Sequence, residues 1–442
     1  MLKNEALLRN RDLYLNRLIA FQDTEPVKII TGIRRCGKSS LMKLMVRHLR
    51  QNNVFDEQII EINFESMEFR GMSAETLYRY VKERLPVDKR AYLFFDEIQR
   101  IDQWQDAVNS FRVDFDCDIY VSGSNAYLLS SEYATYLAGR SVEIKLLPLS
   151  FREFIDFHGY TVREARHPSG AMRKRVYDSG GIYYDPMDLL DAYIKFGGMP
   201  GIADVGLDTD KALILLDGVY STVVVRDILE RERRRGQRRI TDSSLLRKII
   251  LFLADNIGNS TSITSIGNTL INEKLLESNN RKGKPGKPAV QTIQAYVGAL
   301  LESFVFYEIK RFDIKCKEYL RTLGKYYIVD IGLRNFLLGF RDIDAGHITE
   351  NIVYFELLRR GYDVAIGKIG DKEVDFIATN VNEKRYIQVT ETMNDPITRE
   401  REFAPLRMIR DHHEKIVIAK NCDSLVTQDG IKLILLTDFL LG

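Results

Sequence analysis

The 442-residue sequence predicts an α/β protein with a parallel sheet in its N-terminal third. Two observations predict this fold class. Between residue 27 and about residue 147, short apolar strands alternate with amphipathic helical segments, as in parallel sheets with helices on both faces. A glycine-rich loop, Gly32–Ser39, lies between the first predicted strand, Val27–Thr31, and the predicted helix Ser40–Arg50. Strand, loop and helix therefore follow one another in the order that a phosphate-binding loop requires.

The loop fits the pattern G-x-x-x-x-G-K-[ST] at every fixed position. Its backbone N–H groups and the helix dipole would converge on one anion, and Gly32 and Gly37 allow the close approach. We expect Lys38 to reach the β- and γ-phosphates and Ser39 to bind Mg²⁺. A chance match in a basic loop is the alternative, which the surrounding strand and helix disfavour. The nucleotide-binding residues expected here are Gly32, Ile33, Arg34, Arg35, Cys36, Gly37, Lys38, Ser39 and Ser40.

A second acidic motif follows the apolar segment Ala91–Phe95. Asp96 is expected to complete the Mg²⁺ site with Ser39, and Glu97 to polarise the attacking water. The alternative is an ordinary strand end that meets solvent. Together, the loop and the two acids predict the parallel sheet of a P-loop NTPase. They also predict that the protein hydrolyses ATP.

Two further groups are candidates for the same site. The predicted strand that begins at Asp118 ends in Ser124 and Asn125, and carboxyl ends of parallel strands line the ligand crevice. Either residue is a candidate sensor of the γ-phosphate, or else a turn residue that caps the next helix. Arg140 precedes the last predicted core strand, where it serves either as a charge-stabilising finger for a neighbouring subunit or as half of a surface ion pair.

These motifs resemble the AAA-type ATPases of prokaryotes that carry a C-terminal domain of unknown function with a winged helix and a restriction-endonuclease-like fold. The resemblance covers nearly the whole chain. It implies a sensor at Ser124 or Asn125 and a trans-acting finger at Arg140. The residues that carry it are Gly32–Ser39, Phe94–Gln99, Ser122–Ala126, Leu137–Arg140, Pro148–Phe154, Phe196–Pro200, Lys325–Leu333 and Gln388–Thr390.

Composition bears on the partners and the cellular compartment that we expect for this protein. The net charge is +2, so no overall field demands a nucleic-acid or membrane partner. The four cysteines show no metal-ligand spacing and are expected to be reduced thiols in the cytoplasm. No run of about eighteen apolar residues predicts a membrane span, and the charged N-terminal segment is not a signal peptide.

We expect four domains: an ATPase core at 1–150, a helical lid at 151–238, a winged helix at 239–312 and a restriction-endonuclease-like domain at 313–442. Within the lid, the polar stretch 163–184 is expected to be a mobile loop.

Basic segments suggest contact with DNA or RNA. Six arginines lie within Arg231–Arg239, and three lysines and an arginine within Arg281–Pro288. The arginine run could track phosphates or could pair with acids of another subunit. Just before it, Arg226 is a candidate nucleotide-sensing arginine.

Within the predicted winged helix, Thr292, Gln294 and Tyr296 are expected to face a groove as in a recognition helix. The alternative is a winged helix that only packs against the ATPase or a partner.

The last hundred residues place acids in the order of a nuclease metal site. Glu350 and Glu356 fall on a predicted helix, and Asp375 and Gln388 fall on two predicted strands. Thr390 stands where the lysine of such a site is expected, and a hydroxyl cannot supply its charge. We therefore expect a degenerate binding module with doubtful nuclease activity.

The predicted function is Mg²⁺-dependent ATP hydrolysis in a homo-oligomer, coupled to engagement of nucleic acid or a protein partner. The alternatives are an ATP-dependent signalling switch that acts on a protein partner, and an ATP-gated nuclease.

Overall fold

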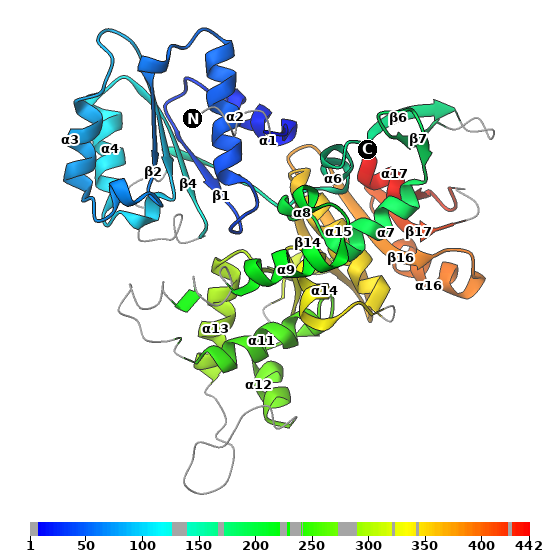
Figure 1. Cartoon of the computed structure of the whole chain (residues 1–442). Coiled ribbons are helices and arrows are strands. Elements are labelled where there is room, and N and C mark those ends of the chain that lie inside the picture. The colour runs from blue at the N-terminus through cyan, green and yellow to red at the C-terminus, as the bar shows by residue number, and fades with distance from the viewer. Residues whose placement is uncertain are drawn as a thin grey trace, which may run out of the picture. The chain divides into compact units, whose positions relative to one another are not determined.

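The computed structural model divides the chain into two compact units (Figure 1). Unit 1 comprises Met1–Pro148 with Glu302–Phe304, and unit 2 comprises Leu149–Leu301 with Val305–Gly442. The structure describes residues 8–125, 139–166, 172–221, 228–229, 240, 242–272, 290–320, 323–341, 344–422 and 427–442. None of the helices in these ranges combines the length and the apolar character needed to cross a membrane.

Unit 1 is built on a five-stranded parallel sheet, which confirms the predicted fold class. Its strand order is β2-β3-β4-β1-β5. The strands are β2 (Ile59–Asn63), β3 (Ala91–Asp96), β4 (Cys117–Gly123), β1 (Val27–Thr31) and β5 (Ser141–Lys145). Every residue of β1 and β3 is buried, as expected for central strands covered on both faces.

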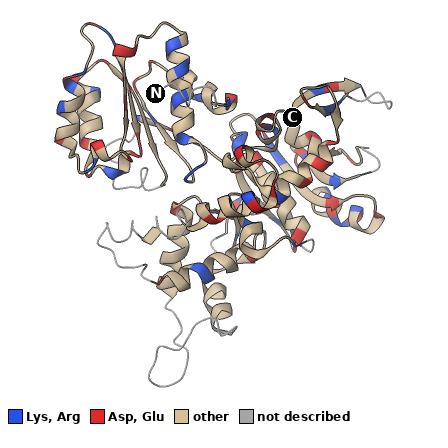
Figure 2. Ribbon diagram, viewed as in Figure 1, with Lys and Arg blue, Asp and Glu red and all other residues tan. Residues whose placement is uncertain are grey.

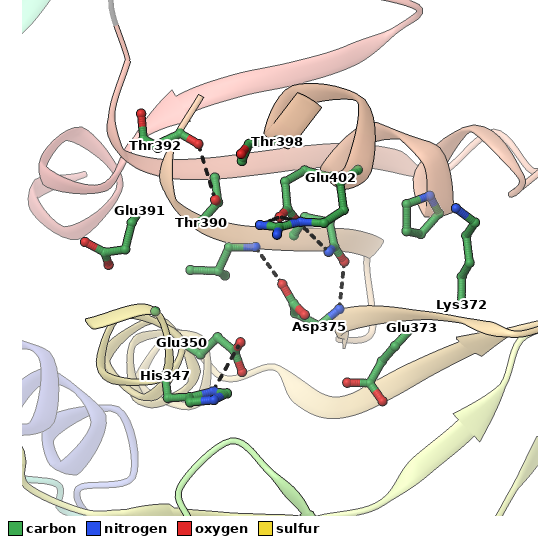
Figure 3. A pocket seen from close by; sticks show the side chains of 15 residues that line it. His347, Glu350, Lys372, Glu373, Asp375, Thr390, Glu391, Thr392, Thr398 and Glu402 are labelled. Atoms are coloured by element: carbon green, nitrogen blue, oxygen red, sulfur yellow. Dashed lines mark hydrogen bonds and ion pairs between the residues drawn. The ribbon is translucent and has the colours of Figure 1, made fainter. Parts of the chain in front are cut away.

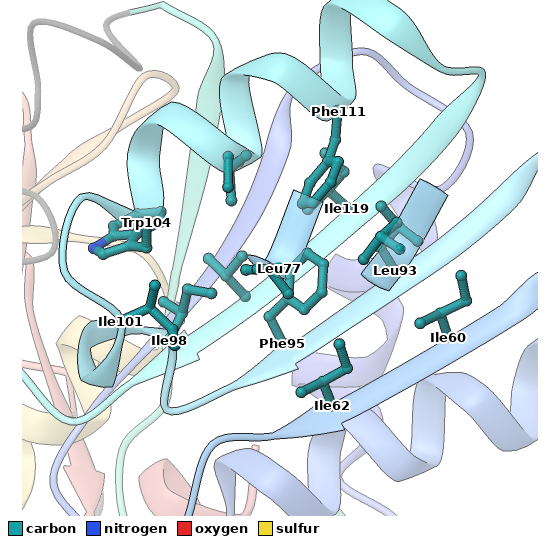
Figure 4. Close-up of a cluster of buried hydrophobic side chains, with 14 of the residues drawn as sticks. Ile60, Ile62, Leu77, Leu93, Phe95, Ile98, Ile101, Trp104, Phe111 and Ile119 are labelled. Carbon is teal, nitrogen blue, oxygen red and sulfur yellow. The ribbon is translucent and has the colours of Figure 1, made fainter. Parts of the chain in front are cut away.

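Helices cover both faces of this sheet (Figure 1). They are α1 (Asp12–Ala20), α2 (Lys38–Gln51), α3 (Ala74–Lys82) and α4 (Trp104–Asp114). The main core lies under α3 and α4, where Leu77, Trp104 and Phe111 pack on β3 and its neighbours (Figure 4). Helix α2 lies on the opposite side (Figure 1). The loop before it follows the end of β1, so it lies at the carboxyl edge of the sheet.

Unit 2 begins with helices and a small antiparallel sheet of order β6-β7-β8. The elements are α6 (Phe151–Phe157), β6 (Thr161–Arg166), β7 (Met172–Tyr177), β8 (Tyr183–Tyr184), α7 (Pro186–Phe196), α8 (Gly201–Val205) and α9 (Thr209–Val219). The prediction of a mobile loop at 163–184 was wrong for the described part of that stretch. Charged residues alternate there with Val162 and Val176, which the strand pairing places opposite each other on one face.

The middle of unit 2 places three helices beside a second antiparallel sheet, of order β10-β13-β9. The elements are α11 (Ser243–Asp255), β9 (Ser260–Thr261), α12 (Ile263–Asn272), α13 (Val290–Glu302), β10 (Phe306–Ile309) and β13 (Gly324–Ile328).

The C-terminal part forms a seven-stranded mixed sheet of order β12-β11-β14-β15-β16-β17-β18. Its strands are β12 (Glu318–Tyr319), β11 (Arg311–Asp313), β14 (Asp363–Ile369), β15 (Lys372–Thr379), β16 (Lys384–Thr392), β17 (Glu414–Asn421) and β18 (Ile431–Leu435). The accompanying helices are α14 (Ile331–Leu338), α15 (Ala345–Arg359), α16 (Pro396–Arg407) and α17 (Leu436–Leu441). The predicted helix that carries Glu350 and the strands that carry Asp375 and Gln388 are confirmed.

Candidate functional site

The loop between β1 and α2 has the backbone of an anion cradle. Gly32 has a φ of +146°, and a Cβ added there would lie 2.1 Å from the carbonyl oxygen of Leu146, so only glycine fits. Gly37 caps α2 with a φ of +104° and offers no side-chain acceptor. By contrast, Ser73 and Ser150 accept hydrogen bonds from first-turn amides of α3 and α6. The first-turn N–H groups of α2 therefore have no side-chain cap, which leaves them available to a phosphate.

Lys38 lies over this loop and is buried. Its Nζ donates to the carbonyl oxygens of Gly32 at 3.0 Å and of Ile33 at 3.2 Å. The same ammonium is 3.9 Å from Oε1 of Glu97, at the end of β3. The structure thus brings together the loop lysine and the predicted water-polarising acid.

Asp96 and Glu97 are both fastened to Ser122, a residue of β4 that the sequence analysis assigned no contact. Its hydroxyl donates to Oδ1 of Asp96 and accepts from the backbone N–H of Glu97 at 3.1 Å. Asn63 Nδ2 donates to the other Asp96 oxygen at 3.3 Å. Glu97 has a left-handed φ of 55°, which turns the chain sharply at the strand end. One hydroxyl therefore fixes the spacing of the two acids.

Two side chains hold the Glu97 carboxylate. Gln99 Nε2 and Ser124 Oγ both donate to Oε2, the latter at 3.2 Å. Asn125 follows the half-buried Ser124 and is itself buried. Of the two predicted sensor residues, the structure places the Ser124 hydroxyl directly on Glu97.

The donor set suits a hard divalent cation. Ser39 offers an exposed hydroxyl at the start of α2, which has no hydrogen-bond partner among the described residues. Asp96 offers a carboxylate, and oxygen donors of these two kinds are the ligands that Mg²⁺ prefers. The predicted residues Arg34, Arg35 and Ser40 lie at the solvent side of the same loop and helix start.

Arg140 lies at the other edge of the sheet. Strand β5 pairs with β1 from Val27 with Ser141 to Thr31 with Lys145. Arg140 precedes Ser141, so about five residues, or roughly 16 Å of strand, separate it from the loop edge. Its side chain is exposed, and it cannot reach the nucleotide loop of its own chain.

Sequence reasoning missed Arg11, which is 3% exposed just before α1. Its Nη1 donates to the carbonyl oxygens of Cys36 and Leu147, both at 3.0 Å, and Nη2 donates to that of Pro148 at 3.5 Å. One guanidinium therefore ties the phosphate loop to the chain that leaves β5.

Cys36 itself is buried within the loop. Burial raises the pKa of its thiol, while Lys38 and Arg11 act in the opposite direction. A buried thiol with a raised pKa is a poor nucleophile, so Cys36 packs the loop and has no chemical task there.

Comparison with known proteins agrees with this geometry. Residues 24–155 match a family model described as an AAA domain. The chain is 37% identical over 434 residues to an uncharacterized protein of Haemophilus influenzae, covering 98% of both chains. It is 30% identical over 416 residues to an uncharacterized protein of Methanocaldococcus jannaschii, covering 91% of this chain and 84% of that one. This chain belongs to their family.

One further family model and one solved structure are also similar to this chain. Residues 187–344 match a model described only as a domain of unknown function. The Walker-type ATPase of Pyrococcus abyssi is 15% identical with a TM-score of 0.47, over 74% of this chain and 95% of that chain. The family model, which matches the segment that contains the phosphate loop, shows that residues 24–155 form an AAA domain.

Beyond the AAA domain, unit 2 of this family member has a pocket of about 550 Å³ (Figure 3). It lies between α15, β15, β16 and α16. The residues that line it are Gly346, His347, Glu350, Lys372, Glu373, Asp375, Gln388, Val389, Thr390, Glu391, Thr392, Thr398, Arg401, Glu402 and Pro405. The predicted Glu350, Asp375, Gln388 and Thr390 meet here, whereas Glu356 lies outside and pairs with Arg359 and Arg360.

A buried lysine to which the sequence assigned no contact lies beside these acids. Lys325 of β13 is 5% exposed, and its Nζ lies 2.8 Å from Glu373 Oε1 and 3.5 Å from Glu350 Oε2. Burial lowers the pKa of Lys325, but Glu350, Asp375 and Glu373 outweigh it and the net shift is upward. A fixed ammonium therefore already neutralises part of the acid cluster.

The carboxylates of this pocket do not fit a metal. Among the described residues no group of three or more His, Cys, Asp or Glu side chains has the arrangement to hold one. Asp375 Oδ2 accepts from Val389 N at 2.8 Å, and Gln388 Nε2 donates to Glu402 at 2.9 Å. Burial and Glu350 raise the pKa of Asp375 well above its usual range. These groups are occupied by one another, so the pocket gives no support to cleavage chemistry.

The predicted groove residues of α13 do not all face outward. Tyr296 is buried, and its hydroxyl accepts from the backbone N–H of Asp242 at 3.0 Å, so its prediction was wrong. Gln294 is exposed and Thr292 is half-buried. Residues Arg226, 231–239 and 281–288 lie outside the described residues.

Proposed function

We propose that this AAA-type protein binds ATP with Mg²⁺ and hydrolyses it. The observation that carries the proposal is the convergence of Lys38 and Glu97, with Glu97 held by Gln99 and Ser124, beside uncapped helix amides. A general base and a phosphate-binding ammonium within 3.9 Å of each other are suited to in-line attack by water.

Each residue of the site has a separate role in the proposed hydrolysis. Lys38 exchanges its bonds to loop carbonyls for phosphate oxygens, and Glu97 accepts a proton from, or orients, the attacking water. Ser39 and Asp96 would hold Mg²⁺, which when bound supplies charge neutralisation at the phosphate oxygens. Ser124 keeps the Glu97 carboxylate in place and responds to the loss of the γ-phosphate.

We also propose that Arg140 completes the site of an adjacent subunit. Its position at the edge of the sheet opposite the loop favours action in trans, in a homo-oligomer. Substituting Arg140 by Ala is then expected to preserve ATP affinity while lowering turnover about 10³-fold or more, the typical contribution of such an arginine. Full activity in that variant would remove the trans assignment.

Engagement of DNA is the proposed task coupled to hydrolysis, with a protein partner as the alternative. Supporting it is the element order α11-β9-α12-α13-β10-β13, in which three helices and an antiparallel sheet follow one another as in a winged helix. Gln294 and Thr292 are the described residues of α13 available for groove contact.

The test is phosphate release from ATP by the purified full chain. Glu97→Gln should lower the turnover number at least about 100-fold while ATP still binds, because the amide cannot accept the proton. Glu75→Gln, on an exposed position of α3 paired only with Arg79, is the matched control and should behave as wild type. Wild-type turnover in Glu97→Gln would overturn the proposal.

A further inference from the structure

The sheet β6-β7-β8 has a basic face that plays no part in the ATPase site. Strand pairing sets Arg163 opposite Arg175 and Ala165 opposite Arg173, and cross-strand partners lie on the same face. Tyr177 pairs with Tyr183 on this face too. Figure 2 shows the concentration of cations on these strands. We name the five residues Arg163, Arg173, Arg175, Tyr177 and Tyr183 the arginine–tyrosine face.

The opposite face of the sheet is covered around Val176 and Lys174, so the arginine–tyrosine face is the outer one. Val176 is fully buried, and Lys174 Nζ donates to the carbonyl oxygen of Leu441 in α17 at 2.8 Å. On the outer face Arg163 is exposed and Tyr183 is 51% exposed.

Cations and rings interleave on this outer face. The Arg163 guanidinium lies 5.3 Å from the Tyr177 ring centre, and that of Arg175 lies 5.9 Å from the Tyr183 ring centre. The two rings meet edge to face at 6.0 Å. The face therefore offers positive charge directly beside flat aromatic surface.

Acids lie near this face: Asp185 and Asp188 act on Tyr183, and Asp438 of α17 lies near Arg173. Within the ranges that the structure describes, none of the three guanidinium groups forms an ion pair with a carboxylate. The strand partners Glu164 and Lys174 lie on the opposite face of the sheet, where Glu164 is exposed. Burial raises the pKa of Asp438 on α17, and the nearby Arg173 and Lys174 oppose the shift.

We propose that the arginine–tyrosine face binds single-stranded DNA. Unpaired guanidinium groups bind phosphates, and exposed tyrosine rings stack with bases that a duplex keeps covered. Phosphates and base faces are the groups that this face would contact, and DNA offers both, so a 2′-hydroxyl is not required. This inference is independent of the proposed ATP hydrolysis, because it concerns residues of unit 2 and binding without nucleotide.

The experiment measures binding of a fluorescent oligo(dT) of about 16 nucleotides, the upper end of common site sizes, to the full chain without ATP. Arg163→Gln/Arg175→Gln should weaken binding about 25-fold near 0.1 M salt and reduce the slope of log K against log salt by about 1.4, as expected for two lost phosphate contacts. Tyr183→Leu should weaken it about fivefold or more through lost stacking, with an unchanged salt slope.

Arg341→Gln/Lys432→Gln is the charge-matched control, since both side chains are in exposed ion pairs elsewhere in unit 2. It should leave affinity near wild type. Photocrosslinking of bromodeoxyuridine-substituted oligo(dT) to wild-type protein should give adducts on the peptide that contains Tyr177 and Tyr183. Equal losses in the control and test variants, adducts only elsewhere, or preference for duplex DNA or oligo(U) would overturn the proposal.

Discussion

Replacing Arg11 by Met tests whether one guanidinium organises the phosphate loop. Met has a similar length but removes the two 3.0 Å hydrogen bonds to the carbonyl oxygens of Cys36 and Leu147. Hydrogen bonds from a charged donor contribute about 1.5–3 kcal/mol each, so unit 1 should lose at least about 3 kcal/mol of unfolding free energy. ATP affinity should fall as well, because the Cys36 carbonyl is no longer held.

The sequence supplies a selective probe for this measurement. Trp104 is the chain's single tryptophan and lies buried in the core of unit 1. Urea unfolding followed by its fluorescence therefore reports on unit 1. With a slope of about 2 kcal/mol per molar urea, the midpoint should drop by about 1.5 M.

Arg79→Met is the control, because Arg79 is exposed and pairs only with Glu75 one helical turn away. It should shift the midpoint by no more than about 0.25 M, since such pairs contribute under about 0.5 kcal/mol and the slope is about 2 kcal/mol per molar. If Arg11→Met unfolds at the wild-type midpoint and binds ATP normally, the assigned role of Arg11 is wrong.

Three further outcomes are expected. Gly32→Ala should abolish ATP binding in calorimetry because its Cβ would lie 2.1 Å from the Leu146 oxygen, whereas Gly71→Ala, also at positive φ but with open space around it, should not. Burial raises the pKa of Asp330 to about 6, so unit 2 should be most stable below about pH 4 with respect to this group and lose about 3 kcal/mol as pH rises through 6; Asp330→Asn should flatten that part of the stability profile measured by circular dichroism. Lys325→Met should destabilise unit 2 by about 3–5 kcal/mol, because Glu350 and Glu373 lose their cation, and adding Glu373→Gln should recover part of the loss in the same assay.

The sequence was most informative where function depends on neighbours in the chain. The parallel sheet and the loop Gly32–Ser39 were predictable, because strand periodicity and glycine spacing are local. So were the two acids at the end of β3, Asp96 and Glu97. The AAA domain is confirmed by the family match to residues 24–155.

Contacts between distant segments were not predictable from local patterns. Arg11 bonds to carbonyls 25 and 136 residues away, and nothing in its own segment indicates either partner. Lys325 of β13 contacts Glu350 of α15, and the absence of a lysine at position 390 gave no sign that this cation lies beside the pocket's acids. The error at Tyr296 was of another kind, because helical spacing already puts Tyr296 on the buried face of α13 with Ile293 and Leu300.

The small sheet β6-β7-β8 was missed for a different reason. Along these strands, arginines and tyrosines on one face alternate with only a few valines on the other. The segment is therefore as polar as a loop, and its composition does not predict strands. Strand pairing, which is absent from composition, is what gathers the arginine–tyrosine face.

The most direct measurement is the affinity of the purified full chain for labelled ATP with Mg²⁺, for wild type and Lys38→Ala. Saturable wild-type binding that falls at least about tenfold in Lys38→Ala is expected, since a charged hydrogen bond to phosphate contributes more than about 1.4 kcal/mol. A folded wild-type chain that takes up no ATP, or equal binding by both proteins, would contradict the nucleotide site on which the account rests.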